Sequence, residues 1–237
     1  MRFFRKDNIL FLAGFGLGVY HLLIVSGLIS VSTMPMRLTH IMFAFSILFI
    51  LKPMTPKLDG SPINLAISLS LIAATISASW WMLTRWKAIA FSGGLTETGD
   101  FYAGAILVAV VFEAARRGVG LILALITLVF FSYPFVSPYL PGVLYGRGYS
   151  FERIVLFLTT DTQGVYGIPV GVAATYIIVF TIFGPLLSGL GAGDFFFPVS
   201  VRVTRGLRSA TAKPAVRGSA LMWMGQGSAE GGGAGAR

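Results

Sequence analysis

Apolar stretches long enough to cross a lipid bilayer recur along this 237-residue chain. An α-helix needs about 20 mostly apolar residues to cross the ~30 Å hydrocarbon core. Residues 9–29, 63–83 and 165–190 meet this requirement, and a shorter apolar run over 38–51 ends before Pro53. Backbone groups inside hydrocarbon must be hydrogen-bonded within their own segment, so each stretch is predicted to be helical. The chain is therefore expected to be all-α, a polytopic membrane helix bundle with short loops.

The apolar run over residues 101–135 contains Glu113, Arg116 and Arg117. As a single helix this run would be about 52 Å long, well beyond the ~30 Å hydrocarbon core. A charged residue near the bilayer centre also costs about 2.5–3.5 kcal/mol on insertion scales. Two helices, over 101–115 and 119–133, place both arginines at the membrane surface instead. We therefore expect a junction between spans, with Glu113 paired to Arg116 or Arg117 at helical spacing, rather than an ion site within the membrane.

These runs give about six transmembrane helices, and the basic residues predict their orientation. With the N-terminus inside, thirteen of the eighteen lysine and arginine residues fall in cytoplasmic segments and five fall in outer loops. The positive-inside rule then places both termini in the cytoplasm. The net charge of +9 lies at the ends of apolar segments rather than on one polar face, so the predicted partner is the lipid bilayer and not a nucleic acid.

Residues that carry chemistry are scarce. The chain has no cysteine, which excludes disulfides and thiolate metal sites. His21 and His40 have no acidic residue or cysteine at metal-ligand spacing, so each is expected to be a packing or interface residue. No group of residues points to catalysis, to a metal or to a cofactor, and an enzyme is not expected. Ser150, followed by Glu152 and Arg153, is a candidate start for a short amphipathic helix at the membrane interface.

Several segments, taken in order, resemble one family of membrane transporters. They are RLTHIMFAF, VVFEAARRGVG, FVSPYLPGVLYGRGYSFERIV, TTDTQGVYGIPVGVAATYIIVF and GAGDFF. This ordered set is similar to the fused permeases of tripartite ATP-independent periplasmic (TRAP) transporters, of the 4-span/12-span type that works with TAXI-type binding proteins. In that family a periplasmic substrate-binding protein delivers a small organic anion, and an ion gradient, usually of sodium, drives uptake. The resemblance implies the bacterial inner membrane as the location.

The resemblance also implies an organisation of the chain. Residues 1–117 would form a Q-like four-span unit, and residues 118–193 would begin the large M-like permease unit with two spans. Glu113, Arg116 and Arg117 would then mark the unit junction. Residues 194–237 form a basic, glycine-rich tail that is expected to be disordered.

The stretch GSALMWMGQGSA in this tail resembles the family's GSALMGMISGSA, which opens a helix break near the substrate and ion sites. Gly227 and Ser228 are the candidate substrate-binding residues that this implies. Trp223, Gly225 and Gln226 depart from the family's pattern, and no further apolar span follows. We therefore expect a natural truncation, a frameshift product or a fragment of a longer protein, which would be inactive alone. The alternative is a stand-alone Q-like scaffold or assembly subunit without its own transport path.

Overall fold

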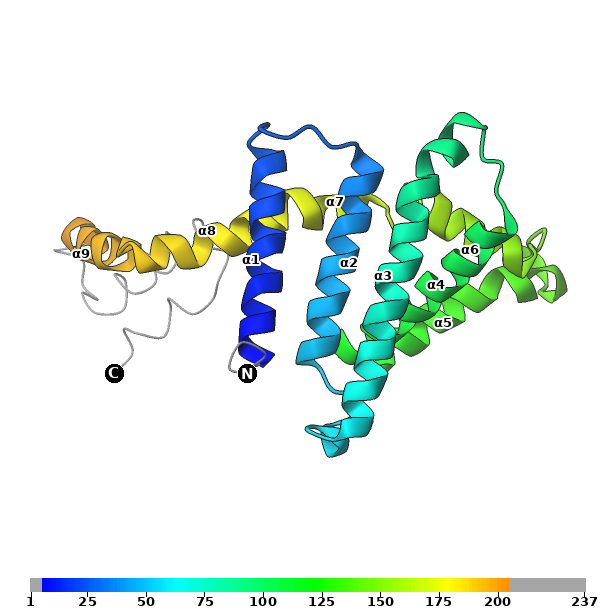
Figure 1. Cartoon of the computed structure of the whole chain (residues 1–237), viewed down its shortest axis with the longest axis horizontal. Helices are drawn as coiled ribbons and strands as arrows, with labels where there is room; N and C mark the ends of the chain where they lie inside the picture. The colour runs from blue at the N-terminus through cyan, green and yellow to red at the C-terminus, as the bar shows by residue number, and fades with distance from the viewer. Residues whose placement is uncertain (1–5, 205–237) are drawn as a thin grey trace. The chain divides into compact units, whose positions relative to one another are not determined.

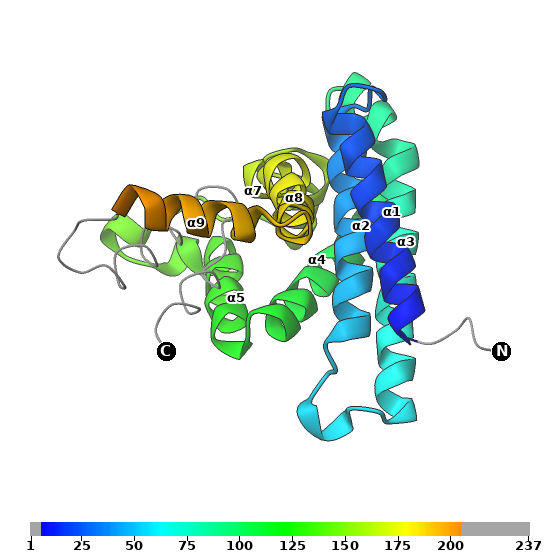
Figure 2. The same ribbon diagram turned by 90° about the vertical axis from the view of Figure 1, so that its left-hand side faces the viewer.

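The computed structural model describes residues 6–204, and that range is helical without strands. Its first half consists of α1 (Lys6–Val25), α2 (Thr33–Leu51), α3 (Pro62–Phe91) and α4 (Thr98–Gly118). Figures 1 and 2 show α1, α2 and α3 lying side by side. The bundle is built by α2 against α3 and by α3 against α4, while α1 packs mainly on α2.

The second half contains α5 (Leu121–Val136), α6 (Phe151–Thr160), α7 (Ile168–Val172), α8 (Ile178–Gly189) and α9 (Ala192–Thr204). A π-helical segment, Ala173–Ile177, lies between α7 and α8. Short 3-10 turns occur at Pro56–Leu58, Ser137–Tyr139 and Gly142–Leu144.

Six helical stretches in the described range are long and apolar enough to cross a membrane, which confirms the expected all-α fold class. They are Asn8–Val25, Thr33–Leu51, Pro62–Phe91, Thr98–Gly118, Leu121–Tyr139 and Ile168–Gly189. The prediction of two helices within residues 101–135 is also confirmed, because the helix breaks between Gly118 and Leu121. Gly120 has a φ of 128° there, a conformation that residues with a side chain rarely adopt.

Three differences from the sequence prediction follow from particular residues. α2 begins at Thr33 rather than at 38, because Pro35 lies in the first turn, where a proline does not interrupt helical hydrogen bonding. α3 continues past residue 83 to Phe91, because no glycine or proline occurs between residue 83 and Gly93. The tail expected to be disordered from residue 194 starts as helix α9, since residues 194–204 are mostly apolar and lack glycine. The rest of that tail lies outside the described residues.

The main buried core lies among α2, α3 and α4. Leu38, Met82 and Leu107 are almost fully buried in it, together with Tyr166 from the turn between α6 and α7. α6 packs closely on α4 at Gly104, where an added Cβ would collide with Thr159.

The chain divides into two compact units, one through Ala174 and one from Thr175. This division does not follow the expected boundary after residue 117, because α5 and α6 both pack on α4. A functional boundary between a Q-like and an M-like unit stays a prediction.

Candidate functional site

A charged cluster occupies the last turn of α4. Glu113 accepts hydrogen bonds from Arg116 Nε and Nη2, at 2.8 and 2.7 Å, and from Arg117 Nε at 2.6 Å. The side chain of Arg117 is fully buried, whereas those of Glu113 and Arg116 are 22% and 28% exposed. The predicted pairing of Glu113 is confirmed, and the carboxylate binds both arginines at once.

Arg117 also connects α4 to its neighbours. Its Nη1 donates to the Lys52 carbonyl at 3.2 Å and to Ser68 Oγ at 3.1 Å. The guanidinium lies 5.3 Å from the centre of the Phe49 ring, within cation–π range. Lys52 follows the last residue of α2 and Ser68 belongs to α3, so one buried side chain holds three helices together at this end of the bundle.

The second arginine of the cluster makes a parallel connection. Arg116 Nη1 donates to the Met54 carbonyl at 3.1 Å, in the loop between α2 and α3. The bonds of both arginines outside α4 therefore go to residues before position 118. They do not by themselves link the two expected units, and the unit-junction role of the cluster stays a prediction.

A second charged cluster lies at the opposite end of α4, and the sequence analysis did not single it out. Asp100 is fully buried and accepts from Arg85 Nε at 3.2 Å, from Arg85 Nη2 at 3.3 Å and from Trp81 Nε1 at 3.0 Å. It also accepts from the Glu97 backbone N–H at 2.8 Å as part of a capping box. Glu97 pairs with Arg85 at 2.9 Å. The acidic residue three positions after Glu97 was the available sequence signal.

The turn between α6 and α7 inserts into the bundle. Arg37 Nη1, on α2, donates to the Tyr166 carbonyl at 2.6 Å. Gly171 lies against the Arg37 guanidinium, and a Cβ added there would come within 2.6 Å of Arg37 Nη2. Gly164 is held equally close to the backbone of Leu158. These contacts give Gly164 and Gly171, in the stretch GVYGIPVGVAATY, a role in close packing.

The sixth candidate span is irregular. α7 has five residues and leads into the π-helical segment Ala173–Ile177, and Pro185 lies inside α8. A π-helical segment displaces backbone hydrogen bonds from their α-helical partners, and such segments are frequent at functional sites.

The two histidines meet within the bundle, although 19 residues separate them. His21 is fully buried, and its Nδ1 is 2.9 Å from the Leu17 carbonyl oxygen. Since a carbonyl only accepts, this nitrogen carries the hydrogen, and His21 Nε2 is left to accept from His40 Nδ1 at 3.1 Å. The expectation of separate packing residues is therefore incomplete, because the rings form one hydrogen-bonded pair between α1 and α2.

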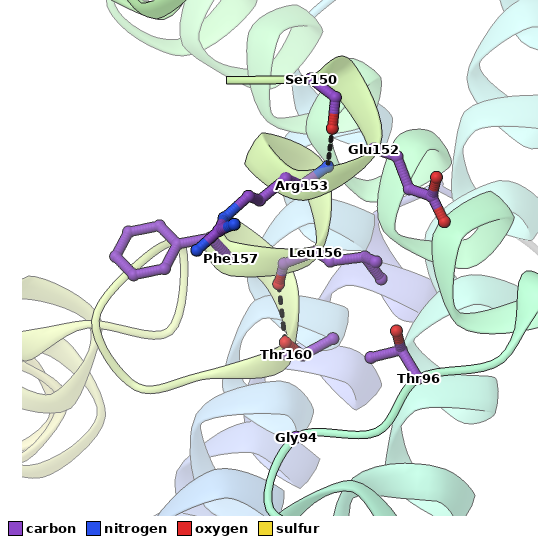
Figure 3. Close-up of a pocket in the computed structure, with 8 residues that line it drawn as sticks. All are labelled: Gly94, Thr96, Ser150, Glu152, Arg153, Leu156, Phe157 and Thr160. Atoms are coloured by element: carbon purple, nitrogen blue, oxygen red, sulfur yellow. Dashed lines mark hydrogen bonds between the residues drawn. The ribbon is translucent and has the colours of Figure 1, made fainter. Parts of the chain in front are cut away.

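A polar cavity of about 400 Å³ lies between α6 and the loop that joins α3 to α4. Figure 3 shows Glu152 and Leu156 on the side of α6 that faces Gly94 and Thr96, with Arg153 and Phe157 on the other side. The Ser150 side chain accepts from the Arg153 backbone N–H at 3.3 Å and so caps α6. The short helix expected after Ser150 is confirmed.

Within residues 6–204 no group of three or more His, Cys, Asp or Glu side chains is arranged to hold a metal ion. The candidate substrate-binding residues Gly227 and Ser228 lie outside the described residues. Comparisons of the chain with protein-family models, with curated proteins and with solved structures find no match.

Proposed function

We propose that this multi-pass membrane protein is a permease component of a TRAP transporter, which takes up small organic anions with a periplasmic TAXI-type substrate-binding protein. The support from the sequence is the ordered set of segments that resemble this family. The location in the bacterial inner membrane, the cytoplasmic termini and a sodium gradient as driving force belong to the same proposal.

The observation that carries the proposal is the irregular sixth span. Secondary transporters place solute and ion sites at discontinuous helices, where freed backbone groups bind the ligand. The π-helical segment Ala173–Ile177 supplies such an irregularity inside an otherwise apolar helix. Further along the same span, Pro185 lies inside α8, where it removes one helical hydrogen bond.

A second candidate is a Q-like scaffold subunit without its own transport path. The observation in its favour is the dense packing of the bundle formed by α2, α3 and α4. Leu38, Leu107 and Tyr166 are each fully buried at its centre. The charged clusters at both ends of α4 hold the helices together rather than lining a passage.

Photocross-linking in cells tests whether the substrate-binding protein contacts this chain. A benzophenone amino acid at Glu152, beside the polar cavity, should capture the binding protein. The same probe at Asp59, an exposed residue in the loop between α2 and α3, should not capture it. Capture at Asp59 alone, or at neither site, would contradict the proposal.

A measurement of solute uptake distinguishes the permease component from the scaffold subunit. The solute is first identified by mass spectrometry of the purified binding protein, and its uptake is then measured in cells that lack the chain. Complementation with a Thr175 deletion, which would turn the π-helical segment into regular helix, should lower uptake more than tenfold. Deleting Phe180 shifts the same helix but keeps the π-helical segment. If both deletions support full uptake at normal membrane levels, the scaffold function is favoured.

A further inference from the structure

A second cavity, of about 600 Å³, adjoins the polar cavity and is mainly apolar. It lies between α5 and α6, and its walls are mainly aromatic and aliphatic. They comprise Thr127, Phe130, Phe131, Pro134, Tyr149, Arg153, Ile154, Phe157 and Leu158. Two of these residues, Arg153 and Phe157, also line the polar cavity. The two cavities therefore meet along one side of α6, the side that Figure 3 shows occupied by Arg153 and Phe157.

Arg153 carries a positive charge at this meeting point, and no acidic side chain within residues 6–204 forms an ion pair with it. Its side chain forms no ion pair or hydrogen bond with any residue that the structure describes. Its guanidinium instead lies 5.6 Å from the centre of the Tyr149 ring. The neighbouring Glu152 points away from Arg153 and lines the polar cavity, where its carboxylate can accept from a headgroup hydroxyl. An anion at the mouth of the apolar cavity would therefore meet an available guanidinium, which binds phosphate oxygens well.

The surroundings determine which kind of anion fits. α5 belongs to a candidate membrane span, and Val129 and Phe130 on it are 68% and 73% exposed. α6 is short and amphipathic, as expected of a helix at the boundary between hydrocarbon and water. The apolar cavity thus adjoins a helix of a candidate membrane span, whereas the polar cavity lies beside the loop between α3 and α4.

We propose that the two cavities together bind one phospholipid with an anionic headgroup. An acyl chain occupies the apolar cavity between α5 and α6, the phosphate lies beside Arg153, and the rest of the headgroup extends into the polar cavity near Thr96 and Thr160. The lipid would fill the space between the two helices. This site does not depend on a transport function.

Native mass spectrometry of the full chain tests the site. The protein, purified in mild detergent and stripped of lipid, is titrated with phosphatidylglycerol and with phosphatidylcholine of the same acyl chains. We expect phosphatidylglycerol to bind about fivefold more tightly, the ratio that one basic side chain near anionic lipid provides. Arg153→Gln should remove this preference and Arg153→Lys should keep most of it. Arg147→Gln, a neighbouring exposed arginine outside both cavities, should change nothing.

A second pair of variants tests the position of the acyl chain. Thr127→Trp fills the apolar cavity and should weaken the binding of both lipids, whereas Val129→Trp makes the same change on α5 outside the cavity. Phe157→Ser removes an exposed wall of the cavity and should also weaken the binding of both lipids. It replaces Thr127→Trp in this test if the tryptophan variant does not fold. The proposal fails if Arg153→Gln behaves like Arg147→Gln. It also fails if the folded cavity variants bind lipid as tightly as Val129→Trp.

Discussion

Removing the carboxylate of Glu113 should destabilise the bundle more than removing either arginine beside it. The cationic side chain of Arg117 is fully buried and has Glu113 as its only anionic partner in the described range. Breaking a buried ion pair by removing one partner costs about 3–5 kcal/mol, because the remaining charge is left uncompensated. We therefore expect Glu113→Gln to lower the free energy of unfolding by about that amount.

The two arginine variants should cost less, for different reasons. Arg116→Gln breaks a pair whose members are 28% and 22% exposed, and such a pair contributes about 0.2–1 kcal/mol. Arg117→Met removes the buried charge itself and leaves Glu113 paired with Arg116. Its cost is the lost hydrogen bonds to Lys52 and Ser68, about 1–3 kcal/mol in all.

The double variant Glu113→Gln/Arg117→Met provides the decisive comparison. Without Arg117 no buried charge remains uncompensated, so the double variant should be more stable than Glu113→Gln alone. Reversible unfolding in mixed micelles, followed by tryptophan fluorescence, measures all four free energies. If the double variant were less stable than Glu113→Gln, the stability losses caused by the two substitutions would be independent of each other. The buried-charge reasoning would then be wrong.

Other predictions address the remaining contacts. Tyr166→Phe should change stability by less than about 1 kcal/mol, because the buried hydroxyl has no hydrogen-bond partner among the described residues, whereas Tyr166→Ala should cost about 3–5 kcal/mol in the same unfolding assay. Gly104→Ala should force α6 away from α4 and cost about 1–3 kcal/mol, and an unchanged melting temperature would exclude the close contact with Thr159. Reporter fusions at Gln163 and at the C-terminus should report periplasm and cytoplasm respectively, and matching signals from both sites would contradict the proposed topology.

The sequence determined the number and type of the main elements. Apolar length fixes a membrane helix, because hydrocarbon offers no other partner for backbone groups. The cost of burying charge divided residues 101–135 correctly into two helices, and helical spacing identified the pairing of Glu113 with its arginines. These are local properties, and a local pattern is enough to predict them.

Tertiary structure decided which distant groups meet. Arg117 bonds to Lys52 and Ser68, and His21 bonds to His40, because particular helix faces pack together. Nearly uniform apolar helices show no strong amphipathic pattern, so the sequence does not reveal which face points inward. The two cavities around Arg153 are of the same kind, because they exist only where α6 meets α5 and the loop between α3 and α4.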